Sequence, residues 1–141
     1  MSRSTEDKQT RLAAVPLFAG ADRKAMRNLV EAVEEVTVSG GTTLINQGGF
    51  PAEFSVIVTG SARVEVNGTD VATLGPDDVI GELAFLARTA ASATVTATSD
   101  CELLVIRYGR LEKILDGDPG FVRQLTEALA RRLLATNEML S

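Results

Sequence analysis

A run of glycine, acidic and small residues between Val79 and Val95 contains the residue types best suited to ligand binding. Its composition is that of a strand end, a Gly81-Glu82 turn, one short helical turn and a loop entering another strand. A glycine lets the backbone approach a ligand closely, and successive backbone N–H groups at a helix start can hold an anion. Glu82 stands where a carboxylate would accept hydrogen bonds from sugar hydroxyls. We therefore take this segment as the candidate binding site.

Catalysis and metal binding have little support in the sequence. The chain has no histidine, which excludes Ser-His and Cys-His nucleophilic catalysis, histidine bases and most transition-metal sites. Ser92 and Thr94 are candidate nucleophiles, but no lysine lies near them in the sequence, so we expect no catalytic residues. Asp77 and Asp78, with Glu82, could suggest a metal site. Asp77 and Asp78 follow Gly75 and Pro76, and this sequence is typical of a turn, so we expect no metal.

The composition is typical of a single soluble domain. The chain has 141 residues and is 45% hydrophobic with few aromatic side chains, enough for an aliphatic core. No apolar run approaches the roughly 20 residues that cross a bilayer, and no secretory signal is visible, so we expect a cytoplasmic protein without membrane contact. The net charge of −5 argues against a nucleic-acid partner. We expect the single cysteine, Cys101, to be a small buried residue.

The pattern of the first two thirds predicts helices followed by a small antiparallel sandwich or barrel. Residues 1–10 have the composition of a flexible tail, and residues 11–141 form the expected domain. Asp22 is a plausible N-cap for a helix that extends toward Val33. After Gly40-Gly41 the pattern changes to short β-branched segments separated by turn residues. The expected strands are Thr43–Ile45, Phe54–Thr59, Ala62–Val66, Val71–Leu74, Thr94–Ala97 and Leu103–Arg107.

The chain ends in helices, which completes an α+β order. We expect a helix over Tyr108–Leu115, and Asp118 before Pro119 is a suitable N-cap for a last helix. Apolar residues recur along that helix at Phe121, Leu125, Leu129, Leu133 and Leu140. This stripe packs against the strands and leaves open a second role as a dimer contact. The predicted fold class is α+β, an antiparallel β-roll flanked by N-terminal and C-terminal helices.

In residue types and spacing, the segment around Gly81 resembles the phosphate-binding cassette of cyclic-nucleotide-binding domains. In that family, a Gly-Glu-Leu-Ala run is followed, nine residues after the glutamate, by an arginine that pairs with the cyclic phosphate. Nine residues after Glu82 stands Ala91. The segments 15–20, 46–48 and 56–60 resemble other signatures of the family in the same order. The resemblance covers the chain from about Leu12 onward and implies a jelly-roll-like β-roll.

The terminal helix is similar to that of one branch, the catabolite activator proteins. There the helix packs against its two-fold mate, and a Thr-Ser pair near its end contacts the adenine. Thr136 matches the threonine and Asn137 replaces the serine, while Arg132 matches an arginine that approaches the cassette glutamate. The DNA-binding helix-turn-helix of that branch would begin beyond Ser141. We therefore do not expect a transcription factor that acts alone.

By this resemblance, the ligand site has three parts. Gly81, Glu82, Leu83 and Ala84 would hold the ribose and the cassette backbone, and Ser92, Ala93 and Thr94 would offer amides or hydroxyls near the phosphate. Arg132, Thr136 and Asn137 would approach from the last helix. Ala91 replaces the phosphate-binding arginine, so Arg88 either serves as a substitute cation or is a solvated loop residue.

The resemblance implies a stand-alone regulatory module, not an enzyme. It would bind cAMP or a related nucleotide with weak or altered affinity, because Ala91 cannot neutralise the phosphate, and would signal through its C-terminal helix. The alternative is a degenerate fold that binds no cyclic nucleotide and acts through protein–protein contacts or dimerisation. A homodimer through the last helix and an effector protein of unknown identity are the expected protein partners, and no tightly bound cofactor is expected.

Overall fold

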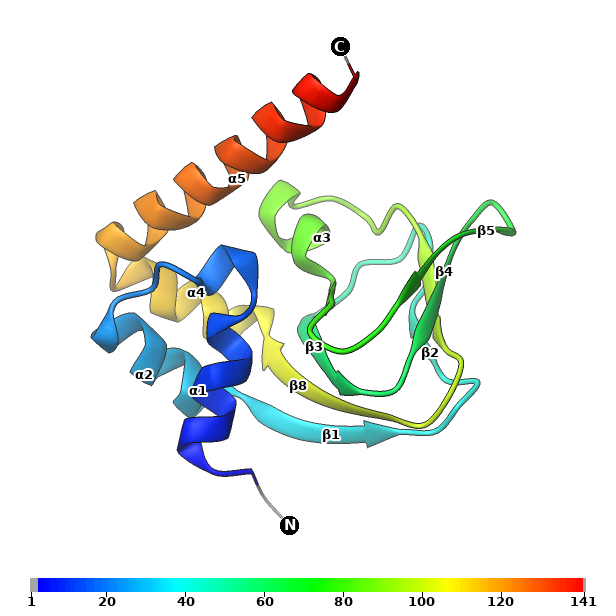
Figure 1. Ribbon diagram of the computed structural model, residues 1–141, viewed down its shortest axis with the longest axis horizontal. Coiled ribbons are helices and arrows are strands. Elements are labelled where there is room, and N and C mark those ends of the chain that lie inside the picture. Colours follow the sequence, from blue (N-terminus) through cyan, green and yellow to red (C-terminus); the bar gives the residue numbers. More distant parts are fainter. Residues whose placement is uncertain (1–2, 141) are drawn as a thin grey trace.

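Helices cover one side of a roll of antiparallel strands in the computed structural model of the protein (Figure 1). The structure describes residues 3–140, without the side chains of Leu83, Arg132, Leu133 and residues 135–140. The helices are α1 (Thr5–Ala13), α2 (Arg23–Ala32), α3 (Glu82–Ala87), α4 (Tyr108–Asp116), α5 (Pro119–Leu140) and the short 3-10 helix η1 (Pro16–Phe18). This arrangement confirms the predicted α+β class.

The strands form two four-stranded antiparallel sheets. In the first sheet the order is β1-β8-β3-β6, formed by Glu34–Val38, Cys101–Arg107, Glu53–Thr59 and Val79–Ile80. In the second the order is β2-β7-β4-β5, formed by Thr43–Ile45, Thr94–Ala97, Ala62–Val66 and Thr69–Leu74. Because β6 leads directly into α3, the first sheet carries the predicted ligand-binding segment at one edge.

Strands β3 and β8 are buried on both faces and separate two hydrophobic cores. Successive side chains of a strand point to opposite faces, so Phe54, Val56 and Val58 pack against the helices while Ile57 faces the interior of the roll. Strand β8 divides in the same way, with Leu104 on the helix side. The continuous apolar character of both strands follows from this double burial.

Three phenylalanines join the helices to the first sheet. The ring centroid of Phe18 in η1 lies 5.3 Å from that of Phe54 in β3 and 6.1 Å from that of Phe121 in α5. Tilted aromatic pairs at such separations add stabilisation beyond their buried area. Asp118 fixes the start of α5, because the backbone N–H of Phe121 donates to its Oδ1 at 3.1 Å. This confirms the predicted N-cap.

The N-terminal region differs from the flexible tail predicted for residues 1–10. Helix α1 begins at Thr5, and the hydroxyl of Ser4 caps it by accepting a hydrogen bond from the N–H of Asp7. The polar composition concealed this helix because α1 buries a single residue, Leu12. Strand β1 was also missed, since the apolar spacing of α2 continues to Val33 just before the strand starts.

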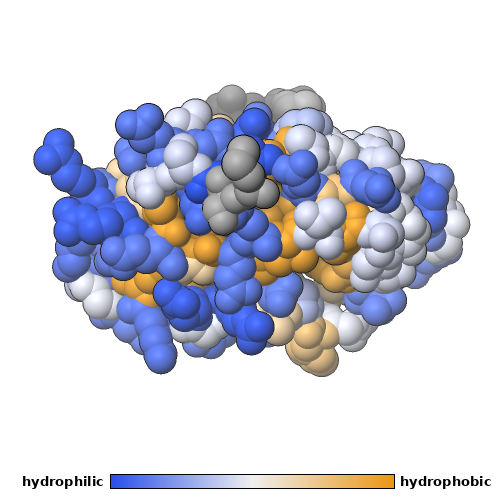
Figure 2. Space-filling model, turned by 90° about the horizontal axis from the view of Figure 1, so that it is seen from below, coloured by the Kyte–Doolittle hydropathy of each residue, from blue (hydrophilic) through white to orange (hydrophobic). Residues whose placement is uncertain are grey.

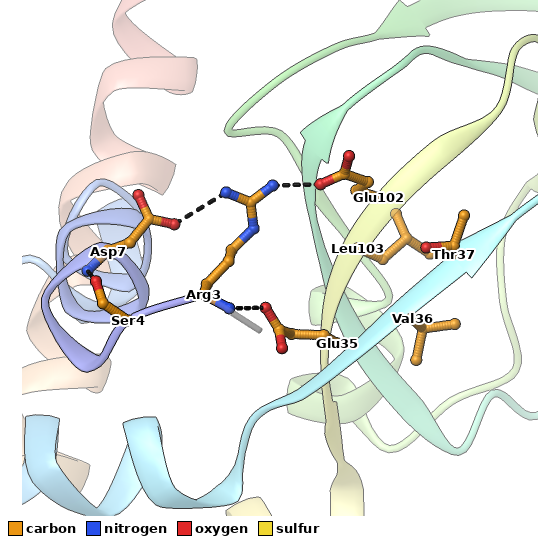
Figure 3. A pocket seen from close by; sticks show the side chains of 8 residues that line it. All are labelled: Arg3, Ser4, Asp7, Glu35, Val36, Thr37, Glu102 and Leu103. Carbon is orange, nitrogen blue, oxygen red and sulfur yellow. Dashed lines mark hydrogen bonds and ion pairs between the residues drawn. The ribbon is translucent and has the colours of Figure 1, made fainter. Parts of the chain in front are cut away.

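Arg3 fastens the start of α1 to the first sheet (Figure 3). Its guanidinium contacts Asp7 Oδ2 at 3.1 Å and the carboxylate of Glu102 on β8, and its backbone N–H donates to Glu35 on β1 at 2.6 Å. The hydrogen bond to Asp7, with further support from Glu102, raises the pKa of the guanidinium. One residue therefore connects α1 with two strands, through its side chain to β8 and through its backbone to β1.

The face seen from below carries a band of apolar side chains between hydrophilic margins (Figure 2). The large exposed apolar side chains of the described residues include Phe50, Val71, Val122 and Leu134. Single exposed apolar side chains of this kind are normal on folded proteins. Within residues 3–140, no helix is both long and apolar enough to cross a membrane.

We expect Arg3→Ala to lower the free energy of unfolding by about 1 kcal/mol, because exposed ion pairs contribute roughly 0.2–1 kcal/mol each and Arg3 makes two. Urea denaturation measures this loss, which should shrink at about 1 M salt because the charges are then screened. Lys24→Ala is the control, since it removes one positive charge from an exposed position of α2. Equal effects of the two variants would contradict this role of Arg3.

Candidate functional site

A pocket of about 230 Å³ opens between the two sheets beside α3. Six of the residues predicted for ligand binding line it together: Gly81, Glu82, Ala84, Ala91, Ser92 and Ala93. The rest of the lining comes from the strands at the two ends of this segment, β6 and β7, and from β2, β4 and β5. Their lining side chains are Ile45, Val64, Leu74, Val79, Ile80 and Val95. The pocket therefore brings both ends of the predicted segment against an aliphatic wall.

Gly81 takes a backbone conformation that only glycine adopts without strain. Its φ is +89°, and a Cβ atom there would lie 2.7 Å from the carbonyl oxygen of Glu53 and 3.0 Å from the hydroxyl of Tyr108. The Tyr108 hydroxyl donates a hydrogen bond to the carbonyl of Gly81. Burial raises the pKa of Tyr108, which keeps this hydroxyl protonated as a donor. The turn is thus packed from two sides.

Helix α3 begins at this turn and places Glu82 at the pocket. Glu82 also borders a small apolar cleft that is lined by Phe85 on α3 and Leu125 on α5. The ring of Phe85 packs on that of Tyr108, with centroids 4.8 Å apart. Figure 1 shows α3 between α5 and the strands. One short helix therefore borders both the candidate ligand site and a cleft that it shares with the last helix.

Ala91 stands where the family has its phosphate-binding arginine, and its backbone is paired with the loop before β3. Its N–H donates to the carbonyl of Gly49 and its carbonyl accepts from the N–H of Gly48, both at 2.8 Å. The residue is only 9% exposed, and it lines the pocket. Its two backbone groups are therefore used within the protein.

Thr94 makes a structural contact, and its predicted role at the ligand stays a prediction. It does not line the pocket, and its hydroxyl accepts the backbone N–H of Gln47 at 2.9 Å. The side-chain amide of Gln47 exchanges two hydrogen bonds with Asn67 in the turn between β4 and β5. Residues 47–49 thus position the loop that contains Ala91. Sequence reasoning noted this stretch as a family signature without assigning it a role.

Four predicted residues cannot be placed at the pocket by their side chains. Leu83 lies in α3, and Arg132, Thr136 and Asn137 lie in α5, but all four side chains are outside the described part of the structure. Their predicted contacts with a ligand remain predictions.

Arg88 does not line the pocket. It ends α3 in the left-handed conformation with φ +54°, and its side chain is 80% exposed. Its Nη1 lies 3.6 Å from Oε1 of Glu112 on α4. This placement agrees with a solvated loop residue better than with a substitute cation.

The described part of the pocket lining includes one ionisable side chain. Among the described side chains that line it, Glu82 is ionisable, and none is a lysine or arginine. Asp77 and Asp78 belong to the turn before β6: Arg11 on α1 lies 3.4 Å from Asp77, and Asp78 accepts the N–H of Gly75. These contacts agree with the turn expected from the sequence.

Sequence reasoning missed Tyr108 and the aliphatic wall of the pocket. Tyr108 was expected only as the first residue of a helix, and its contact with Gly81 joins residues 27 positions apart. The wall residues were assigned to strands, but their convergence depends on how the two sheets pair. Inward alternation along each strand was the available signal.

Comparison with known sequences yields one family match. The family model described as "Cyclic nucleotide-binding domain" matches residues 35–118. The Pycsar effector protein PaPycTIR of Pseudomonas aeruginosa is 35% identical over 114 residues, which cover 80% of this chain and 37% of that protein. A cAMP-dependent protein kinase regulatory subunit of Schizosaccharomyces pombe is 32% identical over 105 residues, covering 74% of this chain and 26% of that protein.

Solved structures share the fold. The N-terminal domain of a transcriptional regulator from Streptomyces coelicolor A3(2) has a TM-score of 0.79 and 32% identity, covering 93% of this chain and 94% of that one. The regulatory domain of Toxoplasma gondii PKA, a co-crystal structure with cAMP, has a TM-score of 0.74 and 26% identity, covering 80% of this chain and 46% of that one. The chain spans between 26% and 41% of the length of the curated relatives it matches.

We expect Gly81→Ala to lower the free energy of unfolding by about 2–4 kcal/mol. The left-handed conformation alone costs a non-glycine residue roughly 1–2 kcal/mol, and the contact with the Glu53 carbonyl adds to it. Gly109→Ala is the control, because it lies in α4 with open space around it and should stabilise by about 0.5–1 kcal/mol. Urea denaturation of both variants checks this, and unchanged stability of Gly81→Ala would contradict the packing described.

Proposed function

Because the chain belongs to the cyclic nucleotide-binding domain family, we propose that it is a regulatory module that binds cAMP or a related cyclic nucleotide with weak or altered affinity. One observation carries the proposal: Gly81, Glu82 and residues 91–93 line the same pocket. These positions match the ribose and phosphate ends of the family's cassette. This agreement supports the proposal that a nucleotide binds in the pocket.

The proposed roles follow the two ends of the pocket. Glu82 accepts hydrogen bonds from the ribose hydroxyls, and the close turn at Gly81 lets the backbone approach the ligand. Ser92 offers a hydroxyl at the phosphate end. Arg132 approaches Glu82, and Thr136 with Asn137 contacts the base, as the resemblance to the catabolite activator proteins implies.

Weak affinity follows from the side chain at position 91. Hydrogen bonds to a charged group contribute roughly 1.5–3 kcal/mol each, so the loss of a bidentate arginine lowers affinity by about ten- to a thousand-fold. The acidic balance of the chain, with its net charge of −5, adds a mild repulsion of any anion.

The proposed signal passes through α3 to α5. Glu82 lines the pocket, and Glu82, Phe85 and Leu125 border one cleft, so a ligand that repositions α3 also changes what α5 packs against. A ligand with higher affinity for one arrangement of α5 shifts the population toward it. The partner that reads this change is an effector protein, or a second copy of the chain that contacts α5.

A second candidate is a degenerate pocket that binds no cyclic nucleotide. The absence of a lysine or arginine among the described lining residues favours it, as does the exposed position of Arg88. In that case the domain acts through protein–protein contacts or dimerisation.

The test of binding is thermal unfolding with millimolar cAMP or cGMP. A ligand at about 100 times its dissociation constant adds roughly 2.7 kcal/mol, which raises the Tm of a domain of this size by about 5–10 °C. We expect a rise of several degrees with at least one of the two. An unchanged Tm with both at millimolar concentration would favour the degenerate pocket.

Ala91→Arg should increase the affinity for the cyclic nucleotide by about ten- to a thousand-fold, because it restores a cation at the phosphate end. Isothermal titration calorimetry measures the change. Ala91→Met is the matched control, since it adds length without charge and should not increase affinity. Arg88→Ala tests whether Arg88 is a substitute cation, and it should leave binding unchanged because Arg88 does not line the pocket. No gain in Ala91→Arg would mean that the phosphate does not bind near position 91.

A further inference from the structure

We propose that the groove between α1 and α2 binds an amphipathic helix of a partner protein, with carboxylates beside the apolar face of that helix. The groove has a volume of about 530 Å³, and its lining shares no residue with the pocket beside α3. The proposal therefore goes beyond the proposed function and does not depend on whether a nucleotide binds. Three observations carry it: an apolar floor that follows two helices, arginines without a carboxylate partner, and walls that are held in place.

The floor of the groove is apolar and runs along the two helices, which lie side by side (Figure 1). On α2, Met26 and Val30 lie one turn apart and pack against the core beneath them. On α1, one face forms an uncharged wall of Thr5, Gln9 and Ala13. At a helical rise of about 1.5 Å per residue, the wall from Thr5 to Ala13 is about 12 Å long, a little over two turns. This shape suits a helix that binds by its apolar face.

The α2 wall of the groove carries two arginines without an ion pair. Arg23 and Arg27 are exposed and lie one turn apart, and no carboxylate among the described side chains pairs with either of them. Six other arginines in the same part of the structure do form ion pairs. Arg23 also stands in the first turn of α2, where the positive end of the helix dipole disfavours a cation. A carboxylate supplied by a partner would offset both effects.

The two carboxylates that line the groove are not paired with these arginines. Asp22 caps α2, and its Oδ1 accepts the backbone N–H of Ala25 at 2.8 Å. Glu31 lies two turns along α2 from Arg23, at the other end of the groove. The groove is therefore basic near the start of α2 and acidic near its end. A partner helix with acidic residues in its first turns and a basic residue in its last turn matches this polarity, and its own dipole favours the same distribution.

Contacts within the protein hold both walls in place. Helix α1 is attached to β8 through Arg3 and to the turn before β6 through Arg11, whose Nη1 lies 3.4 Å from Asp77. On the inner side of α2, Ala25 and Leu29 are fully buried. A groove that is already formed spares the partner the cost of ordering it, which favours binding.

Charge also argues against the last helix of a second copy as the occupant. Helix α5 carries three arginines and two glutamates, so its net charge is positive. It would bring further positive charge to Arg23 and Arg27. A helix of a different protein, with carboxylates at these positions, fits the groove better.

The experiment measures the binding of two labelled synthetic helices to the full chain by fluorescence anisotropy. Both are alanine-rich peptides of about 18 residues, long enough to form a helix in water, with leucines along one face. In the first peptide two glutamates, four residues apart, lie beside the leucines and a lysine follows. In the second peptide both glutamates are replaced by lysines. We expect a dissociation constant of about 10–100 µM for the glutamate peptide and binding at least about ten-fold weaker for the lysine peptide, because the latter repels Arg23 and Arg27.

Arg23→Glu combined with Arg27→Glu should reverse the preference between the two peptides. The double variant should lose about ten-fold or more in affinity for the glutamate peptide and gain affinity for the lysine peptide. The matched control combines Arg110→Glu with Lys113→Glu, because it makes the same change of charge at exposed positions of α4 outside the groove, and it should leave both affinities unchanged. Circular dichroism confirms that both double variants are folded. An unchanged preference in the folded groove variant would overturn the proposal, as would a glutamate peptide that does not bind.

NMR spectra of the isotope-labelled chain locate the bound glutamate peptide. We expect the changes of amide chemical shift to centre on α1 and α2, including those of Thr5 and Gln9. Changes confined to α5 or to the pocket beside α3 would overturn the proposal. A chain that dimerises in size-exclusion chromatography and becomes monomeric with Arg23→Glu and Arg27→Glu would assign the groove to a second copy and would also overturn it. No nucleotide is present in these measurements, so their outcome leaves the proposed function untouched.

Discussion

The close packing of the backbone at Gly81 is the constraint on which the candidate site depends. The Glu53 carbonyl and the Tyr108 hydroxyl leave no room for a Cβ atom, and the left-handed φ turns the chain from β6 into α3. Glu82 comes next and is aimed at the pocket by that turn. If the turn opened, α3 would lose both its attachment to β3 and its contact with the start of α4. The ligand site and the helical side of the protein therefore meet at one residue.

Strands β3 and β8 give this turn a rigid support. Each carries side chains of both cores, so neither strand can shift without disturbing the packing of the helices and of the roll together. Protein interiors are close-packed and transmit displacement in preference to absorbing it. Arg3 adds a polar attachment on the same sheet through Glu35 and Glu102. Ion pairs and a hydrogen bond of Arg3 thus attach the α1 end of the helical layer to the strands. Aromatic contacts between Phe18 and Phe54 attach its centre.

Features that depend on local sequence could be predicted, and features that depend on distant contacts could not. The bounds of β2, β4 and β7 agree with the predicted strands, because turn glycines and β-branched runs mark them. The Asp22 and Asp118 caps were equally local. Helix α1 was missed because its contacts with α2 and η1, and not an apolar stripe, stabilise it. In the site, the cassette was predicted from its residue types and spacing. The hydrogen bonds of Tyr108 with Gly81 and of Thr94 with Gln47 depend on how the strands pair.

The hydrogen bonds of Ala91 with Gly48 and Gly49 separate the shape of the pocket from its charge. These hydrogen bonds use main-chain atoms, which every amino acid except proline supplies equally, so they do not require a particular side chain at position 91. A change of side chain at this one position can therefore alter the charge at that end of the pocket and leave the two hydrogen bonds of the loop available. Domains with this loop could diverge in the charge of their ligands by single substitutions, without rebuilding the fold.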